Sequence, residues 1–123
     1  FRFQSKKKEI TVTQQSVGDL VIEANKSLIE ILLSNLLTNA IRHNHNKGKI
    51  DILLNSKTLT IANTGKAESL DTSKLFQRFQ KQTADNSSSG LGLEISKKIT
   101  ELYQFKIDYR FDSSLHQFII DFF

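Results

Sequence analysis

The stretch Leu28–Asn44, LIEILLSNLLTNAIRHN, decides the fold of this chain. Its apolar residues recur at intervals of three and four, which predicts a helix with a wide apolar face directed toward a core. Asn35, Asn39, Arg42 and His43, spaced four, seven and eight from the first of them, share one polar edge of that helix. Such an edge is either a solvated stripe or the wall of a ligand cleft, and this stretch alone does not distinguish the two.

Length and composition set the limits of the interpretation. The 123 residues are enough for one domain, 1–123, with a substantial core, and too few for two. The absence of cysteine excludes disulfides, thiol chemistry and cysteine-rich zinc sites, and it is typical of a reducing compartment. The net charge of +4 is mild and its densest basic run, 6–8, is typical of a solvated linker, so we predict no nucleic-acid partner.

The sequence also carries signs of a longer parent protein. It begins at Phe1 and contains no methionine, so we expect a fragment. No apolar run approaches the roughly 20 residues that cross a bilayer, which says nothing about the parent.

The pattern around the helix predicts the remaining elements. Residues before 10 are expected to be irregular, and Asn25 is expected to cap the long helix. We predict strands over 10–13, 20–22, 50–54, 59–62, 106–111 and 117–122, and helices over 26–43 and 90–102. The polar stretch 63–89 is expected to form a long loop, and a long loop in a compact domain is usually functional. Strand hairpins with inserted helices predict an α+β fold: a two-layer sandwich with a mixed, mostly antiparallel sheet and helices on one face.

Two further stretches have the composition of ligand-binding loops. In SSSGLGL, 87–93, Gly90 and Gly92 allow close approach of the backbone, and the free N–H groups of the following helix attract anions such as phosphate. In Asn63-Thr64-Gly65, a polar side chain at a strand end suits the edge of a flat heteroaromatic ring. Read separately, each stretch is more often a plain helix entry or a turn.

Together and in this order, the motifs resemble those of the ATP-binding catalytic domain of bacterial sensor histidine kinases, which shares the Bergerat fold with gyrase, chaperone and mismatch-repair ATPases. NLLTNAIRHN is similar to the N box of that family, IANTGKAESL to its first glycine box, LFQRFQK to its F box, and SSSGLGLEISKKI to its second glycine box. ITELYQFKIDYRF resembles the helix and strand that follow. The resemblance covers nearly the whole chain from Ile10 and implies binding of ATP with Mg²⁺.

The resemblance implies a role for individual positions. Asn39 matches the magnesium ligand, Asn35 and Arg42 match the phosphate edge, and His43 matches a contact to ribose or phosphate. Phe76 and Phe79 match the anchors of a lid over 66–89, from which Arg78 or Lys81 would reach the γ-phosphate. The implied catalytic residues are Asn35, Arg42 and Lys81. The implied nucleotide-binding residues are Asn39, Arg42, His43, Asn63, Gly65, Phe79, Gly90, Leu91, Gly92 and Leu93.

Two departures from the family pattern leave an alternative open. Asn63 stands where aspartate normally accepts a hydrogen bond from adenine, and a neutral acceptor weakens that bond by about 1 kcal/mol. Ser88 stands where the second glycine box usually opens with glycine. A degenerate, nucleotide-free interaction module of the same fold is therefore the alternative to a working kinase domain. A hydrolytic ATPase is disfavoured, because such relatives carry a glutamate at the position of Asn35 to activate water, and asparagine cannot take a proton.

The resemblance also implies partners. The family phosphorylates a histidine on a separate dimerisation domain, and that histidine is typically followed by an acidic residue. The three histidines here, at 43, 45 and 116, are followed by Asn44, Asn46 and Gln117. We therefore expect the phosphoacceptor outside this chain, on the dimerisation domain of the parent kinase, with a response regulator downstream. The fragment is expected to be monomeric and cytoplasmic, in a parent anchored in the inner membrane.

Overall fold

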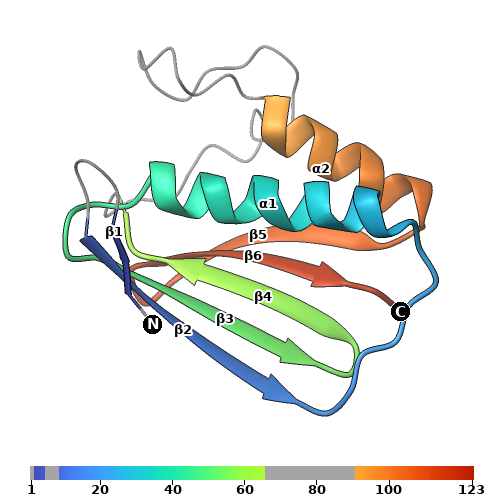
Figure 1. Cartoon of the computed structure of the whole chain (residues 1–123), viewed down its shortest axis with the longest axis horizontal. Coiled ribbons are helices and arrows are strands. Elements are labelled where there is room, and N and C mark those ends of the chain that lie inside the picture. The colour runs from blue at the N-terminus through green and yellow to red at the C-terminus, as the bar shows by residue number, and fades with distance from the viewer. Residues whose placement is uncertain (1, 5–8, 66–90) are drawn as a thin grey trace.

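The computed structural model describes residues 2–4, 9–65 and 91–123, and it forms two layers (Figure 1). In chain order the elements are β1 (Arg2–Gln4), β2 (Glu9–Val17), α1 (Lys26–Arg42), β3 (Lys49–Asn55), β4 (Thr58–Asn63), α2 (Leu91–Leu102), β5 (Lys106–Asp112) and β6 (Leu115–Asp121). The six strands form one sheet in the order β1-β2-β3-β4-β6-β5, and both helices cover the same face of it. The predicted two-layer α+β sandwich with a mixed sheet is confirmed.

Helix α1 forms where its apolar spacing and its cap predict it. The Asn25 side chain accepts a hydrogen bond from the Leu28 N–H at 3.1 Å, which satisfies one free donor of the first turn. Leu32, Leu36 and Ala40, spaced by four, are at most 1% exposed and pack into the core. Burying each leucine contributes about 1.5–3 kcal/mol, so this face fixes the helix on the sheet and turns its polar edge to one side.

The chain topology brings distant polar residues to one end of the molecule. Strands β2 and β3 are parallel, so the chain must cross over between them, and α1 is the crossover. Strand β4 then returns antiparallel, with Asn63 opposite Ile50 near the start of β3. The end of β4 therefore lies beside the end of α1, although more than 20 positions separate Asn63 from Asn39 in sequence.

The first part of the chain differs from the prediction. The strand expected over 20–22 is wrong, because residues 19–25 form neither strand nor helix. Strand β2 instead continues to Val17 and ends at Gly18, whose φ of +80° breaks the extended backbone. Pairing with β3 from Thr11 to Val17 overrides the low strand propensity of the polar residues there. The residues expected to be irregular before position 10 include β1, which pairs antiparallel with β2.

The two predicted hairpins are confirmed. Strands β3 and β4 pair antiparallel, as do β5 and β6. Ser113 and Ser114 link β5 to β6, and their φ angles are 53° and 63°. A two-residue turn that matches the twist of its strands requires a positive φ at both positions. The alternation along β6 places His116, Phe118 and Ile120 in the interior.

Candidate functional site

The polar edge of α1 begins at Asn35, which lies against the first turn of α2. Asn35, Asn39 and His43 are half-buried there, and Arg42 is exposed. The Nδ2 atom of Asn35 is buried and has no hydrogen-bond partner within the described ranges 2–4, 9–65 and 91–123. Leaving a buried donor unpaired costs about 1–3 kcal/mol, so this amide is a position where a ligand acceptor would be stabilising.

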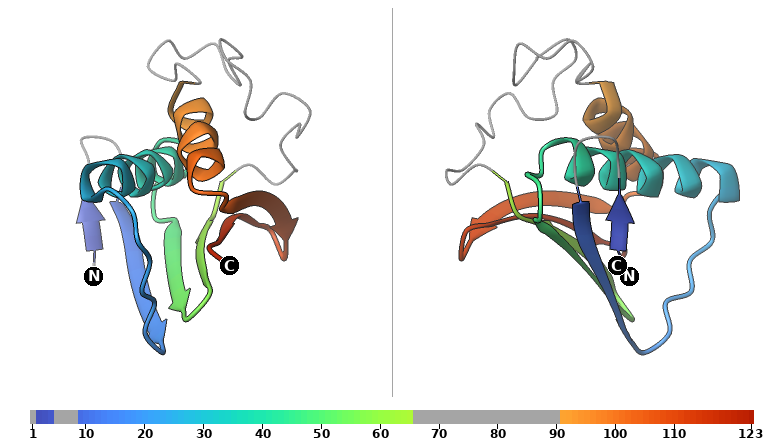
Figure 2. Two further views of the ribbon diagram at one scale, coloured as in Figure 1. Left: turned by 90° about the vertical axis from the view of Figure 1, so that its right-hand side faces the viewer. Right: turned by 60° about the vertical axis from the view of Figure 1, so that its left-hand side comes forward.

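Helix α2 starts against this edge, and the two helices lie side by side in both further views (Figure 2). A Cβ atom placed on Gly92, in the first turn of α2, would be 3.7 Å from Cγ of Asn35. Farther along α2, Ser96 and Thr100 are buried, and their hydroxyls donate to carbonyls of their own helix, which allows close packing. The N-terminus of α2, whose first backbone N–H groups have no acceptor within the helix, therefore begins beside the amide of Asn35.

Asn63 provides a second unsatisfied amide at the end of β4. It is 2% exposed, and its Nδ2 donates to the carbonyl oxygen of Thr64 at 2.8 Å, which fixes the orientation of the amide. Its Oδ1 is buried without a hydrogen-bond partner in the part of the chain that the structure describes. The free group is thus an acceptor, as the exocyclic amino group of adenine requires.

Gly65 and His116 pack together next to Asn63. A Cβ on Gly65 would lie 2.8 Å from the carbonyl oxygen of His43 and 3.3 Å from the His116 ring, so only glycine lets the chain pass between the end of α1 and β6. His116 pairs with Asn63 in the register of β4 and β6, is 5% exposed, and shares a 2.6 Å hydrogen bond with the Tyr109 hydroxyl. The sequence motifs assign this histidine no binding role, although the alternation over 115–121 already directs it inward.

The remaining predicted residues divide into two groups. Leu91 begins α2, and Leu93 is 8% exposed within the hydrophobic core, so its side chain helps to seat α2 on the sheet. The second group lies outside the described residues. It comprises the predicted lid over 66–89 and the start of the second glycine box, with the residues Phe76, Arg78, Phe79, Lys81, Ser88 and Gly90.

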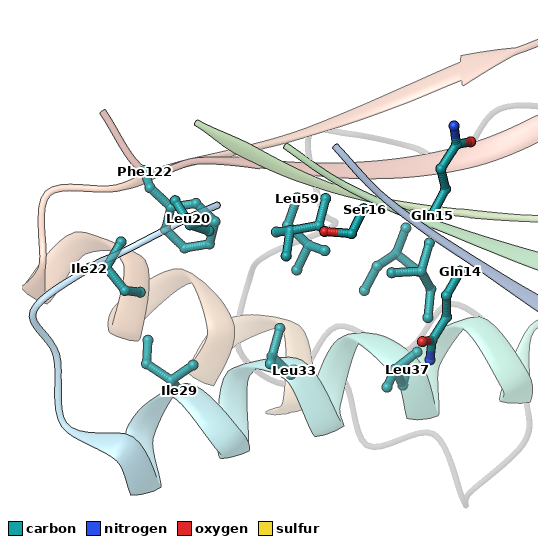
Figure 3. A pocket seen from close by; sticks show the side chains of 13 residues that line it. Gln14, Gln15, Ser16, Leu20, Ile22, Ile29, Leu33, Leu37, Leu59 and Phe122 are labelled. Atoms are coloured by element: carbon teal, nitrogen blue, oxygen red, sulfur yellow. The ribbon is translucent and has the colours of Figure 1, made fainter. Parts of the chain in front are cut away.

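A separate cavity of about 580 Å³ lies between α1 and the sheet, where β4 contributes Leu59 and Ile61 to its wall but not Asn63 (Figure 3). Its walls are mainly aliphatic, with Leu33 and Leu37 of α1 facing Leu59 of β4, and Gln14 and Ser16 at its side. None of the described residues that line it is charged. A site of this composition cannot compensate the charge of a triphosphate, so the cavity is not the candidate nucleotide site.

The donor set fits a magnesium ion that takes most of its ligands from phosphate and water. Among the described residues no group of three or more His, Asp or Glu side chains could hold a metal. Mg²⁺ commonly binds through one or two protein oxygens together with substrate phosphates and several waters. The carboxamide oxygen of Asn39, beside the free donor of Asn35, is the kind of single hard ligand that such a site needs.

Comparison with known proteins places the chain among nucleotide-binding domains. The sequence profile of the histidine kinase-, DNA gyrase B- and HSP90-like ATPases matches residues 24–119. The chain is 31% identical over 107 residues to the heme sensor protein HssS of Staphylococcus saprophyticus, covering 83% of this chain and 23% of that protein. It is 41% identical over 90 residues to HssS of Staphylococcus aureus, covering 69% and 20%. The chain thus spans less than a quarter of these curated relatives.

Solved structures agree with this assignment. The nucleotide-free catalytic domain of the histidine kinase ThkA superimposes with a TM-score of 0.78 at 27% identity, over 91% of this chain and 78% of that one. ThkA in complex with the response regulator protein TrrA matches with a TM-score of 0.75 at 25% identity, over 91% of this chain and 33% of the other.

Proposed function

Since the chain belongs to the family of histidine kinase-, DNA gyrase B- and HSP90-like ATPases, as the ATPase domain of a two-component sensor kinase, we propose that it binds ATP with Mg²⁺ and transfers the γ-phosphoryl group to a histidine on the dimerisation domain of its parent. One observation carries the proposal. Two buried amides within the described part of the chain have an unpaired atom, and these are Nδ2 of Asn35 and Oδ1 of Asn63. One is a donor on the α1 edge and the other an acceptor at the end of β4, as a ligand with an anionic end and an amino-bearing base requires.

Each residue has a distinct task in this proposal. Oδ1 of Asn63 accepts a hydrogen bond from the adenine amino group, and Nδ2 of Asn35 donates to a phosphate oxygen. Arg42, exposed at the end of α1, compensates phosphate charge. A magnesium ion, when bound through the carboxamide oxygen of Asn39, supplies neutralisation of the charge on the transferred phosphoryl group.

The proposed site holds ATP in position, and the residue at position 35 is not a base that could activate a water molecule. The amide of Asn35 cannot accept a proton, so it does not activate water against the γ-phosphate. In the proposed transfer, the bond from the γ-phosphorus to the bridging oxygen breaks, a bond to an imidazole nitrogen of the acceptor histidine forms, and ADP leaves. The rate then depends on bringing that histidine in line with the held phosphate, which is a matter of positioning.

The partners follow from the same proposal. The acceptor is a histidine of the parent's dimerisation domain, and the phosphoryl group passes onward to a response regulator, the class of protein with which ThkA was crystallised. We place the domain in the cytoplasm, in a parent anchored in the inner membrane. Within the described residues, neither helix has the length and apolar character needed to cross a bilayer.

Calorimetric titration with a non-hydrolysable ATP analogue tests the proposal directly. We expect a single site whose affinity falls when magnesium is removed, because Asn39 would hold a Mg²⁺ ion that supplies charge neutralisation for the phosphates. Titration with GTP is the control, since its base presents a carbonyl where adenine presents the amino group that Asn63 would recognise. A folded chain that binds neither nucleotide would instead support the nucleotide-free interaction module.

Gly92→Ala should separate folding from binding. The new methyl group would meet Asn35 at 3.7 Å, an ordinary contact, so the free protein should be unchanged or more stable by up to about 1 kcal/mol, because alanine favours a helix. The same methyl group occupies the space beside the unpaired amide of Asn35, so affinity for the ATP analogue should fall about tenfold. Thermal unfolding and calorimetry on one preparation measure both effects, and equal affinity for the two proteins would contradict the placement of phosphate beside Asn35.

The isolated chain should not phosphorylate itself. Its three histidines lack the following acidic residue, and His116 is buried against Tyr109. Incubation with radiolabelled ATP should therefore label the chain no more than a heat-denatured control. Addition of the parent's dimerisation domain should give acid-labile label on that domain alone, and phosphohistidine on the isolated chain would overturn the assignment of the acceptor.

A further inference from the structure

The end of α1, the start of β3 and the end of β4 are joined by one partly buried set of hydrogen bonds. Asn44, the second residue after α1, is 6% exposed. Its Oδ1 accepts from the Thr64 hydroxyl at 2.6 Å and from the His45 N–H at 2.9 Å. Its Nδ2 donates to the carbonyl oxygen of Lys49, the first residue of β3, at 3.0 Å. One side chain thus connects three elements whose ends all lie at the candidate site.

Thr64 completes the connection from the other side. Its hydroxyl oxygen accepts from the Lys49 N–H at 2.9 Å, and its own N–H donates to the Lys49 carbonyl oxygen at 3.1 Å. These bonds extend the pairing of β3 with β4 one residue beyond the strand. Thr64 also lies between Asn63, whose acceptor atom is unpaired, and Gly65, which packs on the carbonyl oxygen of His43.

Gly48 shows how closely these groups are packed. A Cβ atom at Gly48 would lie 2.0 Å from Oδ1 of Asn44 and 2.5 Å from Oγ1 of Thr64, far inside van der Waals contact. The glycine is therefore required for the bond between Asn44 and Thr64 to form. We call the set Asn44, Thr64, Gly48 and the backbone of Lys49 the clasp.

We propose that the clasp holds the base-recognition end of the site, Asn63, at a fixed distance from the phosphate and metal edge of α1. This inference rests on the proposed function and extends it to two positioning residues, Asn44 and Thr64, neither of which touches the nucleotide. Packing and the turn over 43–48 also join the hairpin of β3 and β4 to α1. A ligand that spans both ends is bound tightly only if their separation is set in advance.

Thr64→Val tests the clasp with the smallest change of shape. Valine keeps the volume but cannot bond to Asn44 or to the Lys49 N–H. We expect affinity for the Mg²⁺ complex of a non-hydrolysable ATP analogue to fall about tenfold. Thr64→Ser keeps the hydroxyl and should restore affinity to within about twofold of the wild type. Thr60→Val, the same substitution four residues earlier in β4, is the matched control and should bind like the wild type.

A second readout separates positioning from general loosening of the fold. Adenosine contacts only the base end, so it does not depend on the separation that the clasp fixes. The affinity of Thr64→Val for adenosine should therefore stay within about twofold of the wild-type value, while its affinity for the ATP analogue falls about tenfold. Equal losses for both ligands, or no loss for either, would overturn the inference. Failure of the wild-type chain to bind the analogue would instead overturn the proposed function, so the two outcomes are distinguishable.

Discussion

Asn39→Ala should abolish most of the stabilisation that magnesium and ATP give to this chain. At a ligand concentration 100-fold above the dissociation constant, the wild type gains about 2.7 kcal/mol by linkage. Loss of Asn39, the proposed protein ligand to the metal, should weaken binding about 100-fold, which leaves roughly 0.4 kcal/mol at the same concentration. The physical reason is that no cluster of acidic or histidine side chains among the described residues can replace that ligand.

Thermal unfolding with and without the magnesium complex of the ATP analogue measures this effect. The variant without ligand should unfold at about the wild-type temperature, because Asn39 is only half-buried and alanine favours a helix. Thr38→Ala, at the neighbouring exposed position of α1, is the control and should keep the full shift. Chelation of magnesium should reduce the wild-type shift to that of the variant, and a shift that survives in Asn39→Ala would exclude this residue as the metal ligand.

Among the glycines of the described structure, Gly48 should be the one at which an added methyl group destabilises the fold most. The added Cβ would lie 2.0 Å from Oδ1 of Asn44, so either the turn must move or the clasp must open. If the clasp opens, the buried side chain of Asn44 loses its hydrogen-bond partners. If the turn moves, the backbone at the start of β3 is strained. We expect a loss of about 3 kcal/mol in the free energy of unfolding. For a domain of this size that lowers the melting temperature by roughly 10 °C.

The matched comparison for Gly48→Ala is Gly92→Ala, the same substitution at a glycine with space for a methyl group. Denaturant unfolding without nucleotide should show a large loss for the first and none for the second. Ligand titration should show a loss of affinity for both variants, because Gly92 borders the amide of Asn35 and the methyl group of Gly48→Ala breaks the clasp that positions Asn63. Equal stability of Gly48→Ala and the wild type would show that the turn accommodates a side chain and that the clasp is not rigid.

Much of the fold follows from local patterns in the sequence. The apolar spacing of α1, its Asn25 cap and the alternation in β3, β4, β5 and β6 are local signals, and each of these elements is present. The strand expected over 20–22 failed because Leu20 and Ile22 are apolar for another reason: they pack against the core from an irregular crossover. An apolar alternation of three residues does not distinguish those two cases.

The sequence by itself determined which motifs this protein carries: a carboxamide-bearing helix edge, a strand ending in Asn63, and a helix preceded by glycine, in the order of an ATPase domain. Only the tertiary structure decided how these parts meet. The parallel crossover through α1 and the antiparallel return of β4 place Asn63 beside the end of α1, and Asn44 and Thr64 lock that arrangement with hydrogen bonds between residues 20 apart. Composition and spacing describe only neighbours along the chain, whereas the separation between Asn63 and the polar edge of α1 is set by contacts across the fold.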